Sequence, residues 1–212
     1  ESMLELEAAY PNNCIAMMGL HPCSVKDNVQ QELDIVEAQL KKRKFIAIGE
    51  IGLDYYWDKI FIQQQIEAFT TQMQWALEKQ LPIVIHTRNA MGETIEAVKP
   101  FAKKGLRGIF HCFSGSQESA QQIISMGFHL GLGGVLTYKN AAVAEAIKEI
   151  PMSHLVLETD APYLSPVPYR GKTNEPAFMI EVAKKLAEIK NIPLQEVAAI
   201  TSNNAKEVFG IE

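Results

Sequence analysis

The sequence predicts an α/β fold of the TIM (β/α)8-barrel type, with the first two β/α units lacking in this chain. Three observations lead to this prediction. Short apolar runs alternate with longer amphipathic runs along the 212 residues. The short runs are almost continuously apolar, as expected of strands covered on both faces. Several of them end in a histidine or a carboxylate, and barrel enzymes carry their chemistry at those strand ends. No low-complexity linker interrupts the chain, so we expect a single domain over residues 1–212.

Strands and helices are expected in alternation. The predicted strands are Cys14–Gly19, Phe45–Glu50, Ile83–His86, Gly108–His111, Phe128–Leu132 and Leu155–Glu158. The predicted helices are Gln31–Lys42, Phe61–Lys79, Gly92–Lys104, Gln117–Met126, Asn140–Glu149, Ala177–Lys190 and Leu194–Phe209. This alternation is typical of parallel βαβ units. A complete barrel has eight such units in roughly 250 residues, and an open doubly wound sheet is the alternative fold.

The composition is that of an ordinary soluble domain, with 47% hydrophobic and 21% charged residues. No apolar run is long enough to cross a membrane, and the start of the chain does not read as a signal peptide. Three cysteines, Cys14, Cys23 and Cys112, are too few for a disulfide framework and indicate a cytoplasmic location. The net charge of −5 argues against a broad basic face for duplex nucleic acid.

Ionisable residues stand at or just after the ends of five predicted strands. They are His21, Glu50, His86, His111 and Asp160. Side chains alternate with a period of two along a strand, so most of these residues complete an apolar face. In a barrel such faces converge at the C-terminal mouth, whereas an open sheet would spread them along one edge. Their joint placement therefore favours the barrel.

Imidazole and carboxylate groups together are suitable ligands for a divalent metal. The set Glu50, His86, His111 and Asp160 suits zinc and tolerates manganese or magnesium. The alternative is that each histidine is separately a satisfied core or surface residue, which would require the same coincidence on several strands. We therefore expect a metal site made of these four residues.

Longer strings of residues resemble those of a known family. They are Gly19-Leu20-His21-Pro22, Gly49-Glu50-Ile51-Gly52-Leu53-Asp54-Tyr55, Ile85-His86-Thr87-Arg88, His111-Cys112-Phe113-Ser114-Gly115, Glu158-Thr159-Asp160-Ala161-Pro162-Tyr163-Leu164 and Arg170-Gly171-Lys172-Thr173-Asn174-Glu175-Pro176. In this order and spacing they resemble the TatD-type deoxyribonucleases of the amidohydrolase-like barrels, from about Met18 to the end. The resemblance implies that Glu50, His86, His111 and Asp160 are metal ligands and that His21 lies near the substrate phosphate. It also implies hydrolysis of DNA phosphodiesters with one or two divalent ions, often by trimming ends.

The sequence departs from the family pattern at its start. The family opens with an Asp-x-His-x-His string that supplies two further ligands, and this chain has no such string. The strands predicted here match the last six of the family's eight. We therefore expect roughly 45–55 further residues before Glu1, with a His-x-His at a strand end, on the basis of about 250 residues for eight units. The absence of those histidines puts a second metal ion in doubt.

The expected chemistry assigns a role to each remaining candidate. A divalent metal can lower the pKa of its water from about 15.7 to about 7, which would supply the nucleophile. We expect Asp160 to take the proton, with Glu50 and His21 as the other catalytic residues. His21, Arg88 and Arg170 are the candidates for binding the substrate phosphate. Arg88 could instead pair with a carboxylate, and Arg170 could belong to a solvated loop.

Two further features bear on the substrate. Glu158 points inward one layer below Asp160 and is expected to support a metal ligand. Aromatic residues gather in the loops after the strands, namely Tyr55, Tyr56, Trp57, Phe113, Tyr163 and Tyr169. Rings of this kind can stack bases, which favours single strands or DNA ends as the partner, or they can cap the upper core. The alternatives are a hydrolase of a small phosphoester, amide or lactone on the same scaffold and a non-catalytic binding protein.

Overall fold

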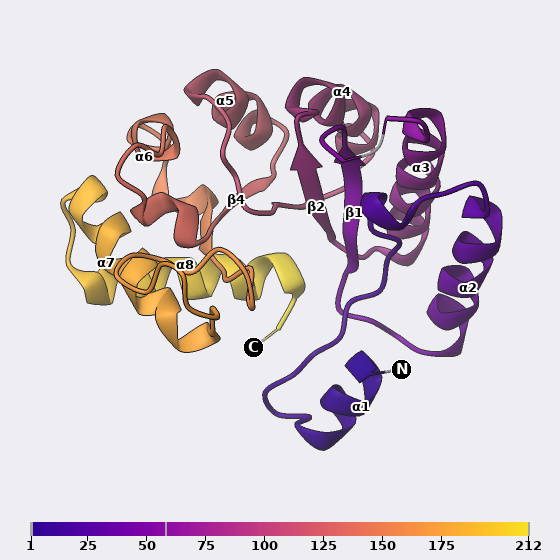
Figure 1. Cartoon of the computed structure of the whole chain (residues 1–212), viewed down its shortest axis with the longest axis horizontal. Helices are drawn as coiled ribbons and strands as arrows, with labels where there is room; N and C mark the ends of the chain where they lie inside the picture. Colours follow the sequence, from indigo (N-terminus) through magenta and orange to yellow (C-terminus); the bar gives the residue numbers. More distant parts are fainter. Residues whose placement is uncertain (1, 58, 212) are drawn as a thin grey trace. The chain divides into compact units, whose positions relative to one another are not determined.

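The computed structural model describes residues 2–57 and 59–211. It divides the chain into two compact units, unit 1 (Glu1–Gly108) and unit 2 (Ile109–Glu212). Both contain parallel strands alternating with helices, as Figure 1 shows along the colour gradient.

Unit 1 contains a parallel pair of strands and the helices that cover them. Its elements are α1 (Ser2–Ala9), the 3-10 turn η1 (Pro22–Ser24), α2 (Val29–Lys42), β1 (Ile48–Asp54), α3 (Ile62–Lys79), β2 (Ile83–Arg88) and α4 (Met91–Ala102). Strand β1 pairs with β2 in parallel, with Gly52 opposite His86 and Asp54 opposite Arg88. This register brings the ends of the two strands side by side.

Helix α3 has the residue pattern that its place against β1 requires. Its buried positions recur at helical spacing and form one face. They are Gln65, Ala68, Phe69, Gln72, Met73 and Ala76. The helix ends at Gln80, which adopts the left-handed conformation with φ 56° and donates its N–H to carbonyls of the last turn. Two of the buried residues are glutamines, and both bind backbone near the candidate site.

Unit 2 contains a three-stranded parallel arrangement in the order β3-β4-β5. Its elements are β3 (Gly108–Phe110), which begins on the last residue of unit 1, α5 (Gln117–Ser125), β4 (His129–Leu132), η2 (Gly134–Thr137), α6 (Val143–Ala146), η3 (Met152–His154), β5 (Leu155–Leu157), η4 (Pro176–Phe178), α7 (Met179–Lys190) and α8 (Leu194–Phe209). Ile109, Val156 and Val208 form a buried apolar cluster that joins β3, β5 and α8. Asn204 of α8 donates to the carbonyls of Met152 and Leu155 and so fixes the start of β5.

Most predicted elements are present, and three differ. The predicted strand Phe45–Glu50 is displaced, because β1 runs over Ile48–Asp54 and Glu50 lies inside it. The predicted strand Cys14–Gly19 forms only an isolated bridge, from Met18 to Ile48. The predicted helix Asn140–Glu149 is reduced to α6 (Val143–Ala146). In the segment after α6, the carbonyls of Ile147, Lys148 and Ile150 accept hydrogen bonds from the Lys190 ammonium.

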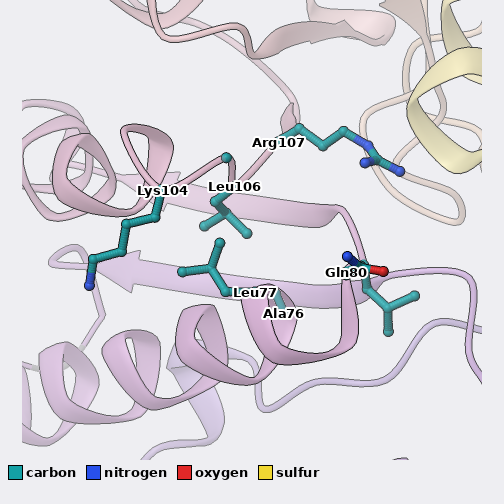
Figure 2. A pocket seen from close by; sticks show the side chains of 8 residues that line it. Ala76, Leu77, Gln80, Lys104, Leu106 and Arg107 are labelled. Atoms are coloured by element: carbon teal, nitrogen blue, oxygen red, sulfur yellow. The ribbon is translucent and has the colours of Figure 1, made fainter.

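Among the described residues, no helix has the length and apolar character needed to cross a membrane. A cavity of about 430 Å³ lies in unit 1, where the end of α3 approaches the residues before β3 (Figure 2). Its lining consists of Ala76, Leu77, Gln80, Leu81, Lys104, Gly105, Leu106 and Arg107. No candidate site residue is among them, and the cavity lies toward the start of β2, away from His86.

Candidate metal centre

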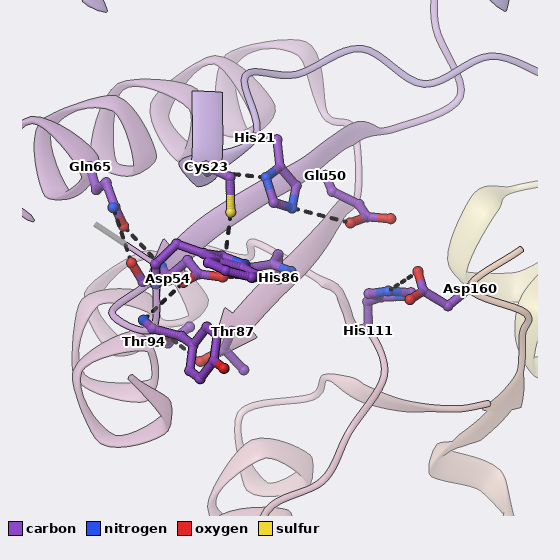
Figure 3. A network of polar contacts seen from close by, with 12 residues as sticks. His21, Cys23, Glu50, Asp54, Gln65, His86, Thr87, Thr94, His111 and Asp160 are labelled. Carbon is purple, nitrogen blue, oxygen red and sulfur yellow. Dashed lines mark hydrogen bonds and ion pairs between the residues drawn. The ribbon is translucent and has the colours of Figure 1, made fainter. Parts of the chain in front are cut away.

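Unit 1 brings together three of the residues that the sequence singled out. Glu50 lies on β1, His86 lies on β2, and His21 immediately precedes η1. Nε2 of His21 is 3.7 Å from Oε2 of Glu50, and the rings of His21 and His86 have centroids 4.4 Å apart (Figure 3). The expected grouping of His21, Glu50 and His86 is therefore present within this unit.

The His21 ring is oriented by the backbone of the turn that follows it. The N–H of Cys23 donates to Nδ1 of His21 at 3.1 Å. Because Nδ1 accepts this hydrogen bond, a neutral ring carries its proton on Nε2. The segment is anchored by Gln72, which accepts from Leu20 N at 2.6 Å and donates to Leu20 O at 3.2 Å. His21 is thus held as a hydrogen-bond donor at Nε2, which suits contact with an anion better than metal ligation.

Asp54 is a residue of this group that the sequence reasoning did not single out. Its side chain is 1% exposed and lies at the end of β1. Oδ2 accepts from Nε2 of His86 at 2.9 Å and from the Cys23 thiol at 3.4 Å. Burial by itself raises the pKa of the Asp54 carboxyl, but hydrogen bonds from His86 and from the N–H groups of Tyr56 and Trp57 outweigh it, so the pKa is lowered. Asp54 is therefore a buried carboxylate that joins several parts of the group.

Arg88 ends β2 beside the aromatic residues that follow β1. Its guanidinium lies 3.7 Å from the centroid of the Tyr56 ring and 5.3 Å from that of Trp57. The two rings meet edge-on, with centroids 4.9 Å apart, and are 49% and 68% exposed. A cation thus lies over exposed aromatic faces.

Unit 2 brings together the other two predicted ligands. His111 is nearly buried and follows β3, while Asp160 follows β5. Nε2 of His111 is 3.5 Å from Oδ1 of Asp160. Nδ1 of the same ring is 3.0 Å from Oε1 of Glu158, which also accepts from the N–H of Cys112. Glu158 contacts a predicted ligand, as expected of a supporting residue.

The remaining predicted residues of unit 2 lie in the loop after Asp160 and near it. The guanidinium of Arg170 lies 3.9 Å from the centroid of the Tyr138 ring, and the Tyr138 hydroxyl donates to Ser165 O. Phe113 is 2% exposed and belongs to the core, which agrees with the alternative that these rings cap the upper core. The Tyr169 ring stacks on Phe178 at 3.9 Å. Tyr163 is 70% exposed.

The donor atoms fit a divalent metal. Ligand atoms at about 2.0–2.2 Å from a tetrahedral ion stand roughly 3.3–3.6 Å apart. The His111–Asp160 and His21–Glu50 separations of 3.5 and 3.7 Å are close to that range. In the His111–Asp160 pair, both of the facing atoms can offer a lone pair to a metal. In the His21–Glu50 pair only Glu50 can do so, because the neutral His21 ring carries its proton at Nε2. In unit 1, Glu50 and His86 are then the predicted ligands that remain.

Two cysteines also lie within reach of these groups, in the sets His21-Cys23-His86 and His111-Cys112-Glu158. The first set is a poor thiolate site, because burial and the neighbouring Asp54 raise the pKa of Cys23 to about 11. In the second set, Glu158 is already engaged by His111 and by the Cys112 N–H. Both sets therefore fit a metal less well than the imidazole and carboxylate ligands.

Comparison with known proteins gives the family. The profile of the TatD related DNase family matches residues 1–210. YabD of Bacillus subtilis, named an uncharacterized metal-dependent hydrolase, is 42% identical over 197 residues, which cover 92% of this chain and 77% of YabD. YcfH of Escherichia coli K12, which bears the same description, is 32% identical over 202 residues, covering 95% of this chain and 76% of YcfH. The crystal structure of YJJV, a TatD homologue from Escherichia coli K12, is 28% identical with a TM-score of 0.85, covering 100% of this chain and 82% of that chain.

The fold and the relatives define the class of the protein as a metal-dependent hydrolase on an α/β fold of the TIM-barrel type. The chain belongs to the TatD family. The predicted fold class and the predicted family resemblance are both confirmed.

Proposed function

We propose that the protein hydrolyses DNA phosphodiester bonds in a metal-dependent reaction, acting on single strands or on ends. The observation that carries this proposal is the Arg88 guanidinium over the exposed Tyr56 and Trp57 rings, two residues after His86 on β2. An arginine can bind a phosphate while the rings stack a base. Bases are accessible for stacking in single strands and frayed ends.

The proposed metal ligands are Glu50 and His86 in unit 1 and His111 and Asp160 in unit 2. His86 would bind through Nδ1, because its Nε2 is engaged by Asp54, and His111 through Nε2, because its Nδ1 is engaged by Glu158. When bound, the divalent cation, which can be zinc, manganese or magnesium, supplies the Lewis acidity that makes hydroxide available near neutral pH.

The proton and charge movements fall to the chain's own side chains. In the proposed reaction the water oxygen forms a bond to phosphorus as the bond from phosphorus to the leaving oxygen breaks. Asp160 takes the proton released by the water, and that proton then leaves with the alcohol product. His21 donates from Nε2 to a phosphate oxygen, and Arg88 and Arg170 offset the charge that builds there. Glu50 would keep the metal in place, so Glu50→Ala should abolish turnover with little loss of stability.

A side-by-side assay tests the proposal. The metal-reconstituted protein is given a single-stranded oligonucleotide, a nitrophenyl phosphodiester and a cyclic amide, with and without a chelator. We expect chelator-sensitive cleavage of both phosphodiesters, and a higher kcat/KM on the oligonucleotide. Turnover of the amide alone would overturn the proposal in favour of another hydrolase on the same scaffold. Turnover of none of the three would favour a binding protein.

A cytoplasmic location is part of the same proposal. Cys14, Cys23 and Cys112 are free cysteines, and reduced thiols suit a reducing compartment.

A further inference from the structure

Asp54 is engaged on both of its oxygens by different parts of unit 1. Oδ2 accepts from Nε2 of His86 at 2.9 Å, and Oδ1 accepts from the N–H groups of Tyr56 and Trp57 at 2.9 and 3.2 Å. The backbone of Asp54 is itself fixed by Gln65, which accepts from its N–H at 2.9 Å and donates to its carbonyl at 3.1 Å (Figure 3). A buried side chain held in this way cannot turn to another partner without losing several hydrogen bonds.

We infer that Asp54 is a positioning residue that holds the His86 ring with its proton on Nε2, so that the lone pair for the metal lies on Nδ1. A neutral imidazole has an N–H on one ring nitrogen and a lone pair on the other. A hydrogen-bond acceptor next to one nitrogen places the proton on that nitrogen and the lone pair on the other. The two N–H groups on Oδ1 keep the carboxylate facing the ring with Oδ2. The inference rests on the proposed role of His86 as a metal ligand.

The Asp54 carboxylate contacts both the proposed metal ligand His86 and the loop that carries the Tyr56 and Trp57 rings. Tyr56 and Trp57 lie in the loop after β1, and the N–H groups of both donate to the Asp54 carboxylate. Oδ2 of Asp54 therefore orients the His86 ring, and Oδ1 holds the backbone of the loop. A substitution that changes only one oxygen separates the two effects.

Asp54→Asn is that substitution. The amide oxygen still accepts from Tyr56 and Trp57, while the amide nitrogen replaces Oδ2 and donates to Nε2 of His86. The ring must then carry its proton on Nδ1, which removes the lone pair from the nitrogen that would bind the metal. We expect a metal affinity reduced about 10–100-fold, the range found when a partner of a ligand histidine is changed.

The test uses nitrogen-15 NMR of the histidine rings in the metal-free full chain at a pH where they are neutral. The wild-type protein should show His86 protonated at Nε2, and Asp54→Asn should show it protonated at Nδ1. Cys23→Ala is the matched control, because it removes the other donor to Oδ2 and leaves the ring contact, so the tautomer should not change. Tryptophan fluorescence, measured in a Trp75→Phe background so that it reports Trp57 alone, should be similar with and without Asp54→Asn.

The outcomes separate this inference from the proposed function. A wild-type ring protonated at Nδ1 overturns the inference without need of any variant, and so does an Asp54→Asn ring that remains protonated at Nε2. Zinc titration by calorimetry and NMR then examines the ligand role. If the Nδ1 resonance of wild-type His86 does not respond to zinc, the proposed ligand role is overturned, whatever the tautomer.

Discussion

Gly131 leaves the space that Glu158 occupies beside His111, and adding one methyl group there tests the role of that contact. A Cβ at position 131 would lie 2.2 Å from Oε2 of Glu158 and 2.7 Å from its Cδ. Real Cβ contacts do not fall below about 3 Å, so the carboxylate must move by roughly an ångström. The Glu158 Oε1 contact with Nδ1 of His111 is 3.0 Å, and such a shift breaks it.

The expected cost of Gly131→Ala falls on metal binding more than on folding. The crowded atoms are the end of a flexible side chain, so the strand can stay in place while Glu158 turns away. Loss of a partner behind a ligand histidine reduces metal affinity and kcat/KM by roughly 10–100-fold. The free energy of unfolding should fall by only about 1.5–3 kcal/mol, the value of one hydrogen bond to a charged group. Calorimetric zinc titration, steady-state kinetics and denaturant unfolding measure the three quantities.

Gly133→Ala is the matched control. A Cβ at position 133 would lie 3.8 Å from the nearest Glu158 atoms, which is ordinary van der Waals contact. Its backbone, with φ −110°, accommodates alanine. If Gly131→Ala and Gly133→Ala bind zinc with the same affinity as the wild type, the role assigned to Glu158 is refuted.

Three further predictions concern other parts of the chain. Trp57→Ala should weaken binding of single-stranded DNA by about 1–3 kcal/mol and leave kcat/KM on a nitrophenyl diester nearly unchanged; equal losses on both would contradict base stacking. Burial lowers the pKa of His129 below its ordinary 6.5, so the unfolded ring gains its proton first and the free energy of unfolding should fall as pH drops below that value. His129→Asn should lose this part of the pH dependence in denaturant titrations, and an unaltered dependence would count against it. Lys190→Met should destabilise unit 2 by about 1.5–3 kcal/mol by removing the ammonium from three carbonyls, and an unchanged Tm would show that water replaces it.

The spacing of apolar residues in the sequence predicted the helices and strands whose boundaries are set by residues close by in the chain. The helix Leu194–Phe209 is present with the predicted bounds, because its apolar face and the Gly210 that follows define it locally. The strand Phe45–Glu50 was predicted to end too early, because a charged residue was taken as the strand end. In the structure the chain remains extended and buried through Asp54.

Unlike Glu158, the supporting residues Gln65, Gln72 and Asp54 were not assigned from the sequence, because their partners lie at other places along the chain. Gln65 and Gln72 lie on the apolar face of α3, and a polar residue at such a position is a signal that could have been used. Asp54 stands on the same strand parity as Glu50 and could have been found in the same way. The role of Gly131 depends on the place of the Glu158 carboxylate, which only coordinates give.

X-ray absorption at the zinc edge of the zinc-loaded protein tests the central claim most directly. The proposed ligands Glu50, His86, His111 and Asp160 predict a shell of nitrogen and oxygen at about 2.0–2.1 Å with the scattering pattern of two imidazoles. Zinc bound instead to the sets that include Cys23 or Cys112 would give a sulfur shell at about 2.3 Å. A nitrogen and oxygen shell that loses an imidazole in His86→Ala and another in His111→Ala is the result we expect. A sulfur shell, or a spectrum unchanged by both substitutions, would contradict the assignment.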